Sequence, residues 1–185
     1  KQVIRTSANV AYLIASNCDS YPCTANTQTV RVYKGNQSGV PTSFARQDSA
    51  HEPVNTGCAC AAVDGSDTIH IVWQERQAAA NTKVRYNTYN TGTDLWGTAE
   101  DIDGNVGAAE DIGQGDQWVS VALDSSGKPH VAYIYHDGTR RHIAYRNRVS
   151  GTWTALTQID DNTYTGNRKA WHPCIAFDSA GRRVF

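Results

Sequence analysis

The chain has 185 residues, which is enough for one sizeable domain with its own core. Strand-forming residues dominate, with 15 Val, 18 Thr and 9 Tyr against 4 Leu and no Met, so the composition argues against helical bundles and alternating βα folds. The net charge of −1 predicts no broad attraction to nucleic acid, and the absence of a long apolar run predicts no membrane insertion.

Three segments of similar sequence follow one another along the chain, and each contains the same series of short strand patterns. Their landmarks recur about every 57 residues, since Asp64, Asp124 and Asp178 are 60 and 54 positions apart. The intervals vary between landmarks, so the insertions fall between the strand patterns, as expected of loops. The predicted units span residues 1–48, 58–103 and 118–160, and the first strand of a fourth unit lies within 172–185.

Each unit contains four short strand patterns separated by turn signals. In the third unit we expect strands over 119–123, 130–135, 142–148 and 152–159. The turn signals between them are DSSG, HDG and SG. Four antiparallel strands in each of several repeats are typical of β-propeller blades. The predicted fold is therefore an all-β β-propeller segment, with three four-stranded antiparallel blades and one strand of a fourth.

Closed propellers have four to eight blades, which bears on what this segment belongs to. The pattern ends inside a unit, and unpaired strand edges promote association between chains. We therefore expect either a piece of a larger propeller or a ring that several copies complete.

Three motifs connect the units with a known class of propellers. They are ALDSSGKPHVAY at 122–133, SGTW at 150–153 and LW at 95–96. With the Tyr-rich third strands, these motifs make the chain similar to the sialidase-like (BNR, or Asp-box) repeat β-propellers. The full Asp-box, S-x-D-x-G-x-T-W, is absent, because the third unit keeps G-T-W without the aspartate. The resemblance therefore implies a diverged member of the superfamily.

Propeller ligands commonly bind on the face made by the loops between blades and the loops between second and third strands. Long polar loops of this kind are predicted at 49–58, 104–117 and 161–172, and at 17–28, 76–82 and 136–141. Arginine can bind carboxylates there, tryptophan can stack on sugar rings, and histidine can exchange protons. The simpler interpretation is that these side chains solvate loop tips and cap blade junctions. The candidate ligand-binding residues are Glu52, Arg76, Trp118, His136, Arg140, Arg141, Trp171 and His172.

The resemblance implies a test for sialidase activity. A sialidase combines three arginines that hold the substrate carboxylate, a tyrosine nucleophile activated by a glutamate, and an acid–base aspartate. The R-I-P motif near the first arginine is missing, because Arg5 lies in VIRTSA. We therefore predict no complete catalytic site in this chain and name no catalytic residue.

The cysteines and acidic residues bear on localisation and metals. Cys18 and Cys23 bracket a short polar loop, which predicts a disulfide and an oxidising, extracellular or cell-surface location. A pairing of Cys174 with Cys58 or Cys60 would leave one cysteine over, and the sequence does not decide the pairing of these three. No spacing predicts zinc. The acidic stretch 100–116 offers oxygen ligands for calcium without EF-hand spacing, and no other cofactor is indicated.

Together these features predict a secreted or surface module for recognition or scaffolding, with carbohydrate as its ligand and no catalysis of its own. One alternative is a fragment of a glycoside hydrolase or polysaccharide lyase whose remaining catalytic residues lie elsewhere. Another is a structural subunit of an extracellular fibre or assembly, in which open blade edges pair between chains.

Overall fold

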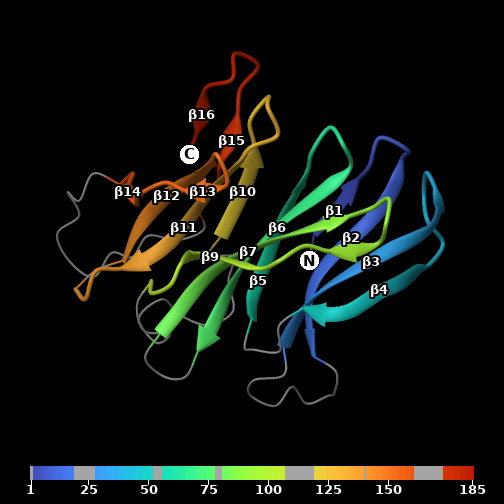
Figure 1. Ribbon diagram of the computed structural model, residues 1–185, viewed down its shortest axis with the longest axis horizontal. Helices are drawn as coiled ribbons and strands as arrows, with labels where there is room; N and C mark the ends of the chain where they lie inside the picture. Colours follow the sequence, from blue (N-terminus) through green and yellow to red (C-terminus); the bar gives the residue numbers. More distant parts are fainter. Residues whose placement is uncertain are drawn as a thin grey trace.

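A computed structural model describes residues 2–18, 28–51, 56–77, 81–106, 119–139, 141–160 and 173–185. Every regular element in these ranges is a β-strand, and all strand pairs are antiparallel (Figure 1). The described residues include no helix that is long and apolar enough to cross a membrane. The prediction of an all-β chain built from repeated antiparallel sheets is confirmed.

Sheet 1 contains four strands in chain order, and none of its edges closes on itself. Alternating residues explain its two faces: Val30 and Val32 point into a core, whereas the intervening residues lie on the opposite face. The strands are β1 (Gln2–Arg5), β2 (Val10–Cys18), β3 (Gln28–Ser38) and β4 (Phe44–His51).

Sheets 2 and 3 repeat this order, but each has a fourth strand that is split into two short pieces. Sheet 2 contains β5 (Thr56–Val63), β6 (Thr68–Gln77), β7 (Asn81–Asn90), β8 (Leu95–Trp96) and β9 (Glu100–Asp103). Sheet 3 contains β10 (Val119–Leu123), β11 (Pro129–His136), β12 (Arg141–Val149), β13 (Thr152–Trp153) and β14 (Thr157–Gln158).

The split corrects the expectation of one continuous strand over 152–159. In sheet 3 a threonine side chain enters the ladder, since Thr154 Oγ1 accepts the backbone N–H of Asn147 at 3.1 Å. The last backbone bond of this piece runs from Thr154 N to Asn147 O at 2.9 Å, and pairing resumes at Thr157, which lies opposite Tyr145. A side-chain hydrogen bond that replaces a backbone bond is therefore the physical reason for the interruption.

Residues 173–185 form a small hairpin where the sequence predicted a single strand. Its strands are β15 (Ala176–Phe177) and β16 (Arg183–Val184), which pair with each other. Figure 1 shows the hairpin, in red, beyond sheet 3, and the three sheets next to one another in chain order.

Hydrophobic cores lie between successive sheets. Trp73 and Ile71 face sheet 1, whereas Val72 on the same strand faces sheet 3, as the alternation of a strand requires. Tyr133 fills the core between sheets 2 and 3, and Ile175 packs on sheet 3 from the hairpin side. Each large apolar side chain buried in this way contributes on the order of 2 kcal/mol to stability.

One turn recurs after the first strand of each repeat and explains the Asp landmarks of the sequence. The carboxylate of Asp64, Asp124 or Asp178 accepts two backbone N–H groups of its own turn, at 2.8–2.9 Å. The fourth residue of each turn has a positive φ, which glycine adopts without strain at Gly127 and Gly181. In sheet 1 Thr6 replaces the aspartate and binds Val10 N at 3.2 Å.

The first strands also touch one another, since β5 lies against both β1 and β10, and β10 lies against β15. The side chain four residues before each turn makes these contacts. Gln2 pairs with the backbone N–H and C=O of Ala61 at 2.7 and 2.8 Å, and Ser120 Oγ accepts Ile175 N at 3.2 Å. The same position therefore links β1 to β5, and β10 to the segment that carries β15.

Candidate functional site

The repeats give the molecule two chemically different ends. The turns after the first strands lie at the upper edge of Figure 1, and each second strand runs from there to the opposite end of its sheet, where the third strand begins. We call the first the turn end and the second the hairpin end. Antiparallel order alone produces this separation, because successive connections alternate between the two ends of a sheet.

At the turn end a buried histidine cluster occurs in two sheets. In sheet 2, His70 Nδ1 lies 2.7 Å from the Tyr86 hydroxyl, and Nε2 lies 3.4 Å from Asp64. Burial lowers the pKa of His70, and burial also raises the pKa of Tyr86 to about 12. Both ring nitrogens have partners within the sheet, so this cluster stabilises the fold.

Sheet 3 repeats the cluster with the same geometry. His130 Nδ1 lies 2.6 Å from the Tyr145 hydroxyl, and Nε2 lies 3.4 Å from Asp124. Burial again lowers the pKa of His130. The neighbouring hairpin covers the cluster, since Phe177 contacts the His130 ring edge-on with centroids 4.8 Å apart. Repetition at equivalent positions indicates a structural role.

At the hairpin end of sheet 3 a third histidine is held differently. His142 lies between two carboxylates, with Nδ1 2.8 Å from Asp160 and Nε2 3.1 Å from Asp137. Its side chain is 2% exposed, whereas the Asp137 side chain is 42% exposed. The Tyr135 ring lies beside the imidazole, with centroids 5.3 Å apart. The site thus places an outward-facing carboxylate against a buried imidazole.

The local sequence HDG builds this arrangement. The register places His142 opposite Tyr135 and Arg141 opposite His136. Gly138 has a φ of 98°, which L side chains rarely adopt, and its N–H donates to His136 Nδ1 at 3.1 Å. The tight turn therefore directs Asp137 toward solvent while its Oδ2 remains on the imidazole.

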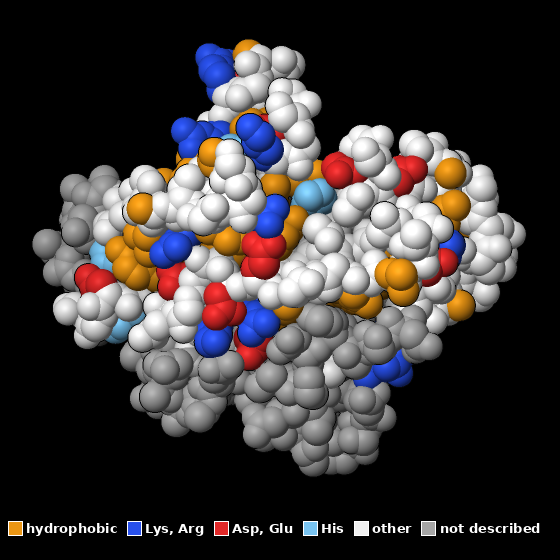
Figure 2. Space-filling model, in the orientation of Figure 1, with side chains coloured by type: hydrophobic (Ala, Val, Ile, Leu, Met, Phe, Trp, Pro, Cys, Tyr) orange, Lys and Arg blue, Asp and Glu red, His pale blue; other side chains and the backbone are white. Residues whose placement is uncertain are grey.

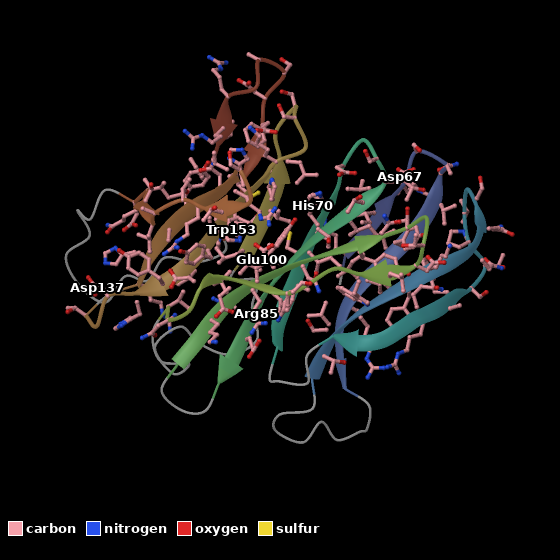
Figure 3. The ribbon with its side chains drawn as sticks, viewed as in Figure 1. Asp67, His70, Arg85, Glu100, Asp137 and Trp153 are labelled. Atoms are coloured by element: carbon pink, nitrogen blue, oxygen red, sulfur yellow. The ribbon has the colours of Figure 1, made fainter. Side chains whose placement is uncertain are left out.

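A network of charges lies on sheet 2 near the same end. Arg85 NH1 lies 3.2 Å from Glu75 Oε2, and Arg85 Nε lies 3.0 Å from Asp101 Oδ1. Lys83 Nζ lies 3.1 Å from the other Asp101 oxygen. Figure 2 shows acidic and basic side chains gathered over this sheet, in the region where Figure 3 labels Arg85. The alternating signs stabilise the outer strands.

The structure describes two predicted ligand residues in full. His136 and Arg141 face each other across the β11–β12 pair, and Arg141 is buried. Arg76 belongs to β6, but its side chain lies outside the described residues. The remaining candidates also lie outside them: Glu52, Trp118, Arg140, Trp171 and His172.

The sequence prediction missed the residues that hold Asp137 in place. His142 and Asp160 are 18 positions apart and meet only because the sheet brings them together. One signal was present, because Asp103 and Asp160 recur at equivalent places. Asp103 accepts the Tyr133 hydroxyl at 2.8 Å and so links sheets 2 and 3.

The cysteine predictions need one correction. Cys60 and Cys174 are free thiols, so Cys174 pairs with neither of its proposed partners. Burial raises the pKa of the Cys60 thiol, although hydrogen bonds from the backbone of Val121 and Ala61 lower it in part. The Cys18 side chain and Cys23 lie outside the described residues, as does the Cys58 side chain.

The acidic stretch considered for calcium is described only in part. Glu100 binds Arg148 at 2.6 Å, and Asp101 and Asp103 also lie in ion pairs with basic side chains. Residues 107–116 lie outside the described residues. Within the described ranges no group of three His, Cys, Asp or Glu side chains is placed to hold a metal ion.

No protein-family model matches the chain, and no curated protein matches its sequence. The site's chemistry therefore has to be read from its own geometry. An outward carboxylate accepts hydrogen bonds from hydroxyl groups, and an adjacent imidazole can fix that carboxylate or exchange a proton with it.

Proposed function

We propose that the sheets are consecutive blades of a β-propeller of the sialidase-like kind, and that the chain serves as a carbohydrate-recognition module of a secreted or surface protein. Three features support the propeller arrangement: the sheets follow chain order, a core lies between each pair, and the first strands touch one another. Radial packing of blades about an axis has these properties.

The Asp137 carboxylate is the observation that carries the binding proposal. Its Oδ1 accepts Thr139 N at 2.7 Å, and its Oδ2 is held by His142 at 3.1 Å. Asp160 in turn fixes the imidazole at 2.8 Å. A carboxylate held in this way loses little conformational entropy when a ligand binds. Carboxylate oxygens accept hydrogen bonds from hydroxyl groups, which are the donors that carbohydrates supply.

The test is binding of the intact protein to a panel of immobilised polysaccharides, followed by titration of the best ligand. Asp137→Asn removes the charge but keeps the size of the side chain. A hydrogen bond to a charged group contributes about 1.5–3 kcal/mol, so we expect affinity to fall at least about tenfold.

The matched control is Asp67→Asn at the turn end, far from Asp137 in Figure 3. Asp67 is also an aspartate that accepts hydrogen bonds, from the backbone N–H and hydroxyl of Ser7. It should leave affinity unchanged. Equal affinities for both variants and the unchanged protein would contradict the proposal.

The same geometry supports a second candidate function, a glycoside hydrolase or polysaccharide lyase. His142 Nε2 lies 3.1 Å from Asp137 and could pass a proton through that carboxylate. Turnover would appear as new reducing ends or as an unsaturated uronate product. His142→Gln should then abolish turnover while binding persists. Binding without either product favours the recognition module.

A further inference from the structure

Two buried polar side chains in sheet 2 have no role in the site described so far. Gln74 lies on β6 and Thr82 on β7, and they are 5% and 3% exposed. The register places Val84 opposite Gln74 on the neighbouring strand. Thr82 is two residues before Val84 on β7, so its side chain points to the same face of sheet 2 as those of Val84 and Gln74. This face packs against sheet 3 through Val72 and Val84. Both polar side chains therefore point into the interface between sheets 2 and 3.

Neither side chain has the partner that burial normally demands. Gln74 Nε2 and Thr82 Oγ1 are both buried without a hydrogen-bond partner among the described residues. Leaving such a group unsatisfied lowers stability, because burial removes its hydrogen bonds to water and nothing replaces them. By contrast, the buried amide of Asn87 in the same sheet binds both Gly97 O and Thr88 N.

The fold itself does not require a polar residue at the position of Gln74. Sixty positions later, the same place in sheet 3 is occupied by Ile134, which is fully buried. An apolar side chain thus fits the repeat at this position without an unsatisfied group. A buried polar group that has no partner needs an explanation, and local rules of this kind are broken mainly at functional sites.

Their place in the fold is the hairpin end. Val106 connects the two sheets there, since its N–H donates to Thr82 O at 2.9 Å and its C=O accepts His136 N at 2.8 Å. Thr82 is therefore two backbone hydrogen bonds from the segment that carries Asp137. The buried donors and the exposed carboxylate belong to the same end of the molecule.

We propose that Gln74 and Thr82 form a subsite that donates hydrogen bonds to oxygen atoms of a neutral sugar. This inference rests on the proposed carbohydrate binding and names its ligand class. An amide N–H and a hydroxyl are uncharged donors, so they match hydroxyl or ring oxygens. They supply no counter-charge for a buried carboxylate or sulfate, whose desolvation would oppose binding. Asp137 adds an acceptor that attracts hydroxyl groups and repels anions.

The experiment combines stability and affinity in one double variant, Gln74→Ile with Thr82→Val. Ile is the residue that the repeat itself uses at this place, and Val has the shape of Thr. We measure the free energy of unfolding without ligand, and the affinity for glucan, mannan, xylan and galactan, with polygalacturonate as the acidic comparison. The variant should be at least as stable as the unchanged protein and should bind the neutral ligand at least about tenfold more weakly.

Several results would overturn the subsite. The subsite is overturned if the double variant binds the neutral polysaccharide with unchanged affinity. If the double variant is also less stable than the unchanged protein, the two donors hold a structural water instead. If the double variant is less stable and also binds more weakly, the isosteric Thr82→Val alone must reproduce the loss of affinity in a protein of normal stability. Preference of the unchanged protein for polygalacturonate overturns the ligand class.

The control for burial is Asn87→Leu, which removes an amide that already has partners. It should destabilise the protein and leave the affinity of the folded fraction unchanged. Failure of the proposed function looks different, because the unchanged protein then binds no polysaccharide at all. If the unchanged protein binds and the double variant binds equally well, only the subsite is wrong.

Discussion

Acidification should loosen the contacts between sheets through His70 and His130. Both residues are 7% exposed, and burial holds the pKa of each below its ordinary value. Arginines from the next sheet oppose protonation further, because Arg148 lowers the pKa of His70 and Arg183 lowers that of His130. Protonation would therefore place a second cation in each interface.

The sign of the effect follows from the direction of the shifts. The unfolded chain takes up a proton near pH 6.5, whereas the folded chain does so only at lower pH. The contribution of the two neutral histidines to the free energy of unfolding is therefore fully present above about pH 6.5, and it is lost as the pH falls toward the folded-state pKa. For each unit by which the folded-state pKa lies below the unfolded-state pKa, protonation removes about 1.4 kcal/mol of stability per histidine. The two sites lie in different sheets, so their contributions should add.

The groups that face these rings set the rest of the pH profile. Asp64 and Tyr86 face His70 together with Arg148. Around His130 the corresponding groups are Asp124, Tyr145, Arg183 and Lys128. Against the effect of desolvation, hydrogen bonds from the backbone N–H groups of Lys128 and Ser126 lower the pKa of Asp124, which keeps its titration outside the interval of interest.

Urea unfolding between pH 7.5 and 5 measures the effect directly. His70→Gln combined with His130→Gln should flatten the dependence of unfolding free energy on pH, even though it lowers stability at pH 7.5. The control is Asn87→Leu, which lowers stability without removing a titratable group and should keep the slope. A flat profile for the unchanged protein, or an equal slope in the double variant, would refute the reasoning.

Three further predictions concern stability and reactivity. Asp124→Ala removes the acceptor of two backbone N–H groups in a repeated turn and should lower the free energy of unfolding by about 1–3 kcal/mol in urea titration. Glu100→Gln breaks a two-point ion pair with Arg148 and should lower the free energy of unfolding by a similar amount. In a double-mutant cycle, the same substitution made in an Arg148→Met protein should have a much smaller effect. Cys174 is exposed whereas burial raises the pKa of Cys60, so iodoacetamide at pH 8 should modify Cys174 before Cys60, as peptide mass mapping will show.

The strand repeat could be read from the sequence because it depends on local signals. Alternating residues and turn motifs placed β10 over residues 119–123, as observed. The aspartates that recur in the sequence proved to cap one conserved turn geometry. Local chemistry of this kind needs no knowledge of distant contacts.

The split fourth strands and the site could not be read in the same way. The split arises from the side chain of Thr154 entering the ladder, which alternation does not reveal. His142 becomes a clamp only when a turn brings Asp137 to one ring nitrogen and a later strand brings Asp160 to the other. Partner choice between distant segments depends on register, which the sequence specifies only through the whole fold.

We propose that the hairpin end binds a neutral carbohydrate. Hydrogen–deuterium exchange of the intact protein, with and without its best polysaccharide ligand, tests this claim most directly. We predict slower exchange in the ligand-bound protein at 135–143 and 158–160, around Asp137 and His142, with no change in the turns at 64–68 and 124–128. Protection confined to those turns would contradict the account.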